Sequence, residues 1–247
     1  MPIEILHVEG RVLYRADTDE MRHAVMQAVE DGVDLSGASL ASADLRGVNL
    51  EDARLAGADL TGCRLDGANV EDADLAGAKL DDASARGANF ESASLAGASL
   101  ARADLAGSNV EKVDFRAAVL EGVKAARANF ERAAMTRVRA AGAVLRQSNV
   151  KKCDLCGADL SQADLSGANL EKCDLREAIL VSAKLAGANI EKADLRGADL
   201  TNADLSEANL EKCDVDGACM DGARLGGANM EKLAGRLRSR DGSGPYR

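Results

Sequence analysis

Aromatic residues make up only 2% of this 247-residue chain, and tryptophan is absent. A conventional globular core would be hard to fill with so few large side chains, whereas a narrow core of leucine and alanine would not. The apolar fraction of 46% excludes a disordered acidic chain, although 29% of the residues are charged. The composition therefore indicates an ordered protein with a thin interior.

Histidine is scarce too, since His7 and His23 are the only two. No serine or cysteine stands in a recognisable nucleophile motif, and there is no glycine-rich phosphate loop. We therefore predict no enzyme activity and no cofactor. The chain also lacks an apolar run of about eighteen residues and a charged-then-apolar leader at Met1. These absences predict a cytoplasmic protein with no membrane partner.

A five-residue repeat dominates what is present. A large apolar residue or an alanine stands at every multiple of five from Leu35 to Met230, which gives forty units, and twenty-six of these central residues are leucine. The residue two positions earlier is alanine in twenty-nine units and valine, cysteine or serine in the others. Neither the period of a helix nor the alternation of a strand fits this spacing. The repeat requires a third backbone geometry.

A second period, of twenty residues, shows how the units are arranged. Asparagine precedes the central residue at every twentieth position from Asn49 to Asn229, and glutamate follows the same central residues except at Lys151. Twenty residues contain four units, so one turn of chain has four sides and equivalent residues stack in columns. We infer a square solenoid of about ten coils, which at about 4.8 Å per coil makes a rod about 48 Å long.

The unit A-(D/N)-L-x-x, seen at Ala163-Asp164-Leu165 and again at 168–170 and 203–205, resembles the pentapeptide repeat family. The resemblance covers residues 33–232. It implies an all-β solenoid, a right-handed quadrilateral β-helix in which the central residue and the residue two before it face inward. It also implies two kinds of role, protein interaction by a rigid rod or protection of topoisomerase II enzymes by imitation of DNA. Fold alone does not decide between them.

Residues 1–32 precede the repeats and are predicted to form a cap. Alternating apolar residues around Glu9-Gly10 predict a β-hairpin, and the apolar stripe that begins at Met21 predicts a helix. Asp17 and Glu20 resemble a capping box before that helix. A cap of this kind covers strand edges that would otherwise invite aggregation.

Residues 233–247 follow the repeats. Leu233 and Leu237 predict a short helix, and the remaining residues predict a flexible basic tail. This end of the solenoid is therefore poorly covered, and a homodimer through the C-terminal end is a hypothesis. The expected domains are thus the cap at 1–32, the β-helix at 33–232 and the tail at 233–247.

The net charge of −10 is unevenly distributed. Residues 31–111 carry −9, residues 116–152 carry +7 and residues 153–232 carry −8. We call the positive segment the basic belt. Its cations follow central residues on all four sides: Arg116, Lys124, Arg127, Arg132, Arg137, Arg139, Arg146, Lys151 and Lys152.

Three interpretations of the basic belt stay open: sequence drift at solvated positions, a docking band for an acidic partner protein, and nucleic-acid binding. The net negative charge and the absence of interleaved aromatic residues argue against direct nucleic-acid binding. We predict a rigid, non-enzymatic scaffold for protein–protein interaction, with the basic belt as its candidate partner-binding surface. The alternative is a DNA mimic that binds and protects DNA gyrase or topoisomerase II, with Glu51, Asp52, Glu71 and Asp72 as its anionic surface.

Cysteines and aspartates raise two further possibilities that the pattern disfavours. Four of the six cysteines occupy the small inward position, where a reduced thiol fills space, while Cys156 and Cys219 fall on outward positions. Cys153 and Cys156 form a C-x-x-C, but their thiols should point to opposite sides of the wall. The column from Asp154 to Asp214 has no calcium-loop spacing. We therefore predict no metal site.

Overall fold

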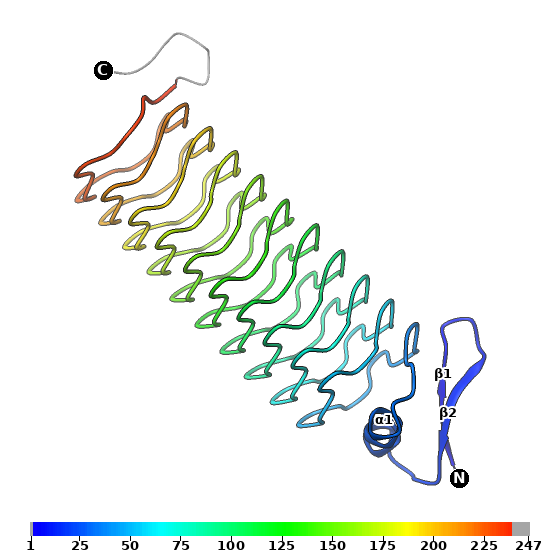
Figure 1. Cartoon of the computed structure of the whole chain (residues 1–247). Coiled ribbons are helices and arrows are strands. Elements are labelled where there is room, and N and C mark those ends of the chain that lie inside the picture. Colours follow the sequence, from blue (N-terminus) through cyan, green and yellow to red (C-terminus); the bar gives the residue numbers. More distant parts are fainter. Residues whose placement is uncertain (1, 239–247) are drawn as a thin grey trace.

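The computed structural model describes residues 2–238, in which the repeats form a rod of stacked coils (Figure 1). Each coil has four short sides joined by tight corners. Single-residue parallel bridges join successive coils at intervals of twenty residues, as between Asn149 and Asn169. The predicted square solenoid with a twenty-residue coil is therefore the observed architecture.

Main-chain hydrogen bonds run along the rod axis on every side. The amide of Leu165 donates to the carbonyl of Lys184 in the next coil at 2.7 Å, and the amide of Asp164 donates to the carbonyl of Ala143 in the previous coil at 2.8 Å. The same pattern recurs at successive central residues. Because the polar groups of the wall pair between coils, the backbone fixes the register that the sequence predicts.

The two inward positions of each unit fill the rod. Nearly all central residues and their small partners are buried from Leu35 to Met220. Phe90 and Phe130 have no exposed surface, and each follows a side whose central residue is alanine, Ala85 or Ala125. Large and small side chains on neighbouring sides thus compensate for each other, as close packing requires.

The corners explain the regular glycines. The amide of Ala168 donates back to the carbonyl of Leu165 at 3.0 Å, and Gly167 between them has a φ of 65°. Glycine adopts this left-handed conformation freely, whereas other residues lose about 1–2 kcal/mol in it. Twenty-two left-handed corner residues are nevertheless not glycine. The corners therefore hold backbone strain wherever the sequence places a side chain there.

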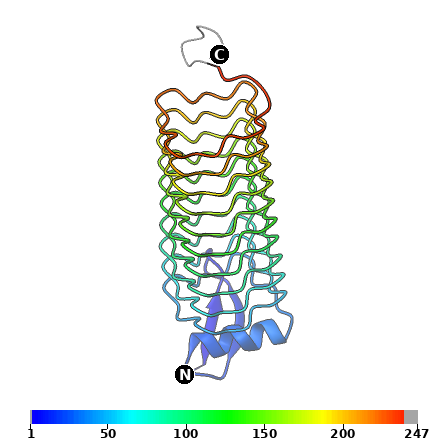
Figure 2. The same ribbon diagram turned by 90° about the vertical axis from the view of Figure 1, so that its left-hand side faces the viewer.

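A hairpin and a helix cover the N-terminal end of the rod. Strands β1 (Ile3–Leu6) and β2 (Val12–Ala16) pair antiparallel. Helix α1 (Met21–Glu30) lies across the open end of the first coil (Figure 2). Its apolar stripe is buried in the same core as the repeats, through Ala24, Val25 and Ala28. The end of the core is therefore shielded from water by α1.

The start of α1 differs from the sequence prediction. Glu20 is itself the N-cap residue and its side chain makes no capping hydrogen bond, so Asp17 and Glu20 do not form a capping box. The other end is held by the rod, because the guanidinium of Arg54 donates to the carbonyl of Gly32. A cation there complements the partial negative charge of a helix C-terminus. Core packing and Arg54 therefore position α1.

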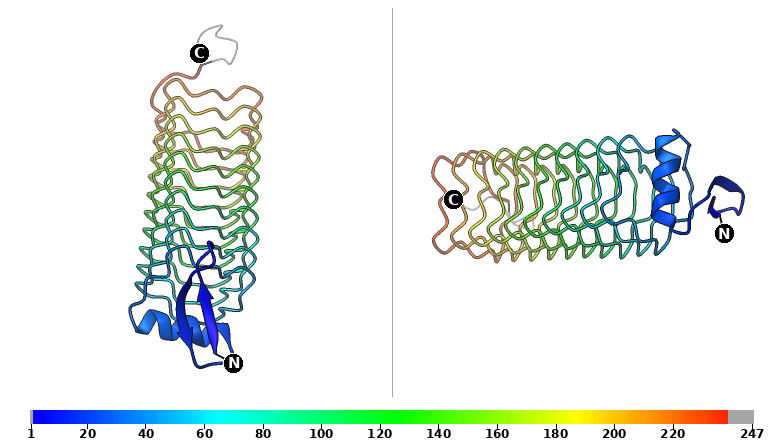
Figure 3. Two further views of the ribbon diagram at one scale, coloured as in Figure 1. Left: turned by 90° about the vertical axis from the view of Figure 1, so that its right-hand side faces the viewer. Right: turned by 90° about the horizontal axis from the view of Figure 1, so that it is seen from below.

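The hairpin covers a free edge of the first coil. The amide of Val8 donates to the carbonyl of Gly37 at 2.8 Å, and the amide of Ser39 donates to the carbonyl of Leu6 at 2.7 Å. Figure 3 shows the hairpin beside α1 at this end of the rod. The ring of His7 lies directly over Gly37, where an added Cβ would collide with it. Gly37 therefore permits the close approach of the hairpin.

We expect Gly37→Ala to loosen the hairpin, because alanine is strained at a φ of 68° and its Cβ meets the ring of His7. Hydrogen exchange at the Val8 and Ser39 amides should accelerate about tenfold or more. Gly47→Ala is the matched control, since Gly47 has a φ of 65° with nothing within 4 Å of an added Cβ. Equal protection of the two amides in both variants would contradict the collision.

The C-terminal end corrects one expectation. Among the described residues 233–238 there is no helix, because the chain continues the wall: Ala234 bridges Asp214 and Arg238 bridges Cys219. The last complete coil still has unpaired backbone groups at this end, and the bridges to them hold residues 233–238 in an extended conformation. Apart from Arg238, the predicted basic tail at 238–247 lies outside the described residues.

Candidate functional site

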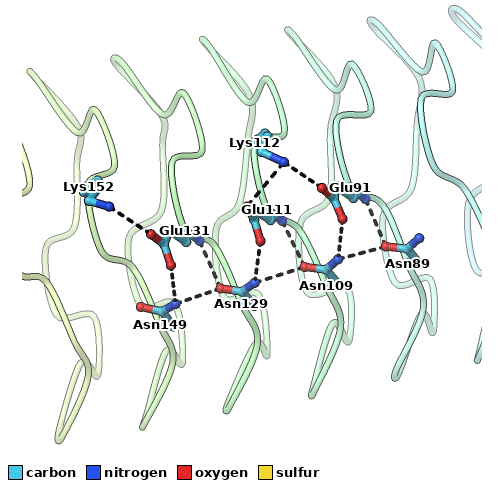
Figure 4. Close-up of polar contacts among 9 residues, drawn as sticks. All are labelled: Asn89, Glu91, Asn109, Glu111, Lys112, Asn129, Glu131, Asn149 and Lys152. Carbon is cyan, nitrogen blue, oxygen red and sulfur yellow. Dashed lines mark hydrogen bonds and ion pairs between the residues drawn. The ribbon is translucent and has the colours of Figure 1, made fainter.

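The side that bears Asn49 to Asn229 carries a continuous ladder of side-chain hydrogen bonds (Figure 4). From Asn69 onward, each asparagine donates through Nδ2 to Oδ1 of the asparagine one coil before, at 2.9–3.4 Å. Each Oδ1 also accepts the backbone amide two residues later, as Asn129 does from Glu131 at 3.2 Å. Because these amides are satisfied within the chain, the column reinforces the stack and offers little to a partner.

Lysines of the chain neutralise the glutamates beside this ladder. Lys112 Nζ lies 2.7 Å from Glu91 and 3.4 Å from Glu111, and Lys152 Nζ lies 3.3 Å from Glu131 (Figure 4). Similar pairs continue to the last coils: Lys172–Glu171, Lys192–Glu191 and Lys212–Glu211. Like-charge repulsion between stacked glutamates is thereby relieved.

The corresponding corner of the first coils is different. Glu51 and Glu71 accept hydrogen bonds from the ladder, at 3.3 Å from Asn69 and 3.0 Å from Asn89. Asp52 and Asp72 occupy the places that lysines take later. Among residues 2–238 these two aspartates have no ion-pair partner. The residues of the predicted anionic surface therefore lie in only two coils, and their role in binding stays a prediction.

Internal ion pairs occupy five of the nine cations of the basic belt. Lys151 Nζ lies 2.6 Å from Glu171, and Lys151 together with Lys172 lowers the pKa of that carboxyl to about 2. The other four pairs are Arg116–Asp114, Arg139–Glu121, Arg146–Asp164 and Lys152–Glu131, at 2.5–3.3 Å. Four of these pairs join successive coils, whereas Arg116–Asp114 lies within one unit. The charge of all five cations is already compensated.

The remaining four cations, Lys124, Arg127, Arg132 and Arg137, form no salt bridge among the described residues, although Arg132 and Lys124 lie close enough to Glu131 and Asp82 to attract them electrostatically. The three arginines stand at successive corners of one coil, at φ values of 60°, 62° and 56°. They therefore project from three different edges of the rod at one level. The structure thus divides the predicted belt into compensated cations and a ring of free ones, a distinction that spacing alone did not provide.

Two of these corners are hollowed. Beside Arg127 a groove of about 720 Å³ lies over Ala106, Gly107 and Ala126 and also contacts Arg146. We call it the Arg127 groove. Beside Arg137 a smaller groove of about 310 Å³ is lined by Arg116 and Glu177, among others. Both grooves form because small residues occupy the same corner in neighbouring coils. The sequence therefore contained a sign of these grooves, namely an arginine in a column of mostly small corner residues.

The four cysteines at inward positions are buried, as their predicted role in packing requires. Burial raises the pKa of Cys63 and Cys173 to about 12 and that of Cys213 to about 11. Cys219 departs from expectation: it sits at an outward position, yet it is buried, with its sulfur 3.4 Å from the Thr201 hydroxyl. Cys156 alone is partly accessible.

We expect Ellman's reagent to titrate one thiol in the native protein and six after denaturation. The reactive thiol should be Cys156, and partial burial should slow it because burial raises its pKa. Cys156→Ser should abolish the native signal, and Cys63→Ser should leave it unchanged. A native signal that survives Cys156→Ser would show that buried positions open.

The aspartate column considered as a cation site is held by arginines. Arg176 binds Asp174 and Arg196 binds Asp194, in each case through Nη2 at 2.5 Å. Each guanidinium also binds the same aspartate through Nε. Their guanidinium groups hold the pKa of both carboxyls below the usual range. Within residues 2–238, no group of three histidine, cysteine or acidic side chains is placed to hold a metal ion.

Comparison with known proteins identifies the family. The profile described as "Pentapeptide repeats (8 copies)" matches the chain in overlapping segments from 34–72 to 193–231. The chain therefore belongs to the pentapeptide repeat family, whose members fold as right-handed quadrilateral β-helices. This confirms the resemblance drawn from the repeats.

Three solved structures are similar to the chain. HetL, a pentapeptide repeat protein involved in heterocyst differentiation regulation in the cyanobacterium Nostoc, is 30% identical over 92% of this chain and 99% of its own, with a TM-score of 0.77. A protein of the Arabidopsis thaliana thylakoid lumen is 29% identical over 47% and 70% (TM-score 0.28). QnrB1, a plasmid-mediated fluoroquinolone resistance protein, is 24% identical over 74% and 88% (TM-score 0.33). No curated protein sequence matches the chain.

None of the described residues forms a helix with the length and apolar character needed to cross a membrane.

Proposed function

We propose that this protein is a rigid, non-enzymatic scaffold that docks an acidic partner protein through the free cations of the basic belt. The observation that carries the proposal is the ring of Arg127, Arg132 and Arg137, which form no salt bridge within residues 2–238, on a chain of net charge −10. Family membership and the likeness to HetL, a protein involved in regulation, support an interaction role.

Backbone strain argues against drift as the origin of this ring. Arg127 and Arg137 each interrupt a corner column in which seven of ten residues are left-handed glycines. A non-glycine residue loses about 1–2 kcal/mol in that conformation. Strained residues persist where the surrounding fold or a function maintains them. Arg127 and Arg137 are exposed, and neither forms a salt bridge among the described residues, which favours the functional explanation.

Affinity capture from native lysate tests the proposal. The triple variant Arg127→Gly, Arg132→Gly and Arg137→Gly should lose the partner that the wild type retains at low salt. The matched control replaces Lys172, Lys192 and Lys212 with glycine, which removes the same charge from left-handed corners outside the belt. Equal recovery of the partner by both triple variants would refute docking at the belt.

The second candidate is protection of gyrase or topoisomerase II by a DNA mimic, and Asp52 and Asp72 are the observation that favours it. Their surface is short, because lysines compensate the glutamates from Lys112 onward. If this candidate is correct, added protein should protect gyrase in a supercoiling assay, and Asp52→Lys with Asp72→Lys should remove the protection.

Association through the C-terminal end is a separate proposal about assembly. Leu225 and Met230 in the last coil are only partly buried, unlike central residues further inside. A second copy could cover them. Light scattering at high concentration should then show a dimer, and a monomer at every concentration would remove the proposal.

A further inference from the structure

We propose that the Arg127 groove is the subsite that receives a carboxylate from an extended Asp/Glu-rich segment of the partner. This inference rests on the proposed function. It names the corner of the basic belt at which an acidic side chain of the partner binds. The groove follows the rod axis along a single corner, from Ala106 to Ser166. Its floor is made of Ala106, Gly107 and Ala126, and two arginines and a glutamine stand at its far half.

The side-chain hydrogen bonds in and beside the groove occupy its acceptor oxygens and leave several N–H donors without a partner within residues 2–238. Arg127 donates through Nε to Gln147 Oε1 at 3.2 Å, which leaves both terminal guanidinium nitrogens. Arg146 Nε donates to Asp164 Oδ2 at 2.7 Å, and the Ser166 hydroxyl donates to Asp164 Oδ1 at 2.8 Å. The Asp164 carboxylate and the Gln147 carbonyl are therefore already engaged. A ligand for this groove must supply acceptors.

The free donors fit a carboxylate. The terminal nitrogens of Arg127 form the planar fork that binds a carboxylate through two parallel hydrogen bonds. The Gln147 amide nitrogen, whose own carbonyl is fixed by Arg127, is a further donor beside it. Side-chain conformation is preorganised here, because the Arg127–Gln147 contact links adjacent coils. This reduces the ordering cost of binding.

The length and the floor of the groove favour an extended polypeptide. The lining residues span four successive coils, or about 14 Å at about 4.8 Å per coil, which equals about four extended residues. The floor of alanine and glycine accepts the backbone and methylene groups between acidic side chains. Base stacking, which single-stranded nucleic acid would require, has no aromatic surface in this groove.

The Arg137 groove does not offer the same site. It is smaller, and the carboxylate of Glu177 lines it. The second cation there, Arg116, is bound by Asp114 through Nη2 at 2.6 Å. An incoming carboxylate would meet the Glu177 charge in this groove, whereas the carboxylate beside the Arg127 groove, Asp164, is already bound by Arg146 and Ser166. We therefore expect a carboxylate to bind at the Arg127 corner and not at the Arg137 corner, although both carry an arginine.

Fluorescence anisotropy with a labelled hexaglutamate peptide at low ionic strength tests the inference. Wild type should bind, and Arg127→Gly should weaken binding about tenfold or more, since a hydrogen-bonded charge pair is lost. Arg127→Lys should recover only part of the affinity, because lysine lacks the fork. Lys124→Ala is the matched control: it removes an unpaired cation of the same side that does not line the groove, and should change affinity less than about twofold.

The outcomes separate the groove from the belt. If Lys124→Ala and Arg137→Gly weaken binding as much as Arg127→Gly, the attraction is diffuse, and the groove inference fails while docking at the belt stands. If wild type binds no peptide, the groove inference fails, and lysate capture still judges the belt independently. Stronger competition by inorganic phosphate than by free glutamate would overturn the carboxylate assignment. Thermal melting of Arg127→Gly shows whether the variant is folded.

Discussion

Replacing Phe130 with alanine is expected to lower the free energy of unfolding by about 3–5 kcal/mol. Phe130 has no exposed surface, and its ring lies 6.0 Å from that of Phe115 between centroids. Removing the ring leaves a cavity inside a narrow tube. The walls of this tube are fixed by main-chain hydrogen bonds between successive coils. Because those hydrogen bonds resist collapse, the loss should fall near the upper part of the range. Urea unfolding of the two proteins measures it.

A second substitution tests whether neighbouring sides share one cross-section. Ala125→Leu alone should destabilise by about 1–3 kcal/mol, because Phe130 already fills the coil. In the Phe130→Ala background the same leucine should enter the vacated space and restore part of the stability. Ala85→Leu in that background is the control, since residue 85 lies two coils away. Additive effects of Ala125→Leu and Phe130→Ala would contradict shared packing.

Replacing Asn129 with alanine should lower the free energy of unfolding by about 1–3 kcal/mol. Asn129 donates to Asn109 at 3.1 Å, and its Oδ1 accepts from Asn149 at 2.9 Å and from the backbone of Glu131. The substitution therefore leaves several half-buried polar groups without partners.

The same ladder provides its own control for this prediction. Asn229 is exposed at the end of the column and donates to Asn209 only, at 3.0 Å. Asn229→Ala should therefore cost clearly less than Asn129→Ala in the same urea experiment. Similar losses of unfolding free energy at the two positions would mean that the asparagine ladder contributes little to stability and that backbone pairing alone holds the coils together.

The repeats made most of the fold predictable. An inward leucine every five residues and an asparagine every twenty leave one geometry open, so the coil, the core and the ladder followed from the sequence. The cap was less predictable in detail. The close approach of His7 to Gly37 and the contact of Arg54 with Gly32 depend on how the cap meets the first coil, which no local pattern encodes.

The candidate site was predictable as a charge pattern and no further. The sequence places nine cations in the belt, but which of them are compensated depends on side-chain reach between coils, as for Arg146 and Asp164. The strain at Arg127 and Arg137 required backbone angles. Likewise, the apolar spacing at Leu233 and Leu237 suggested a helix, whereas unpaired wall edges bind that segment as extended chain.

We infer that free arginines at left-handed corners are kept for binding at the expense of stability. The direct test measures both quantities in one variant, Arg127→Gly with Arg137→Gly. Glycine should relieve about 0.5–1 kcal/mol per corner after its own entropy cost, so the two substitutions together should raise the melting temperature by about 2–8 °C. We expect a higher melting temperature together with loss of the captured partner. Full partner binding by the stabilised variant would contradict it.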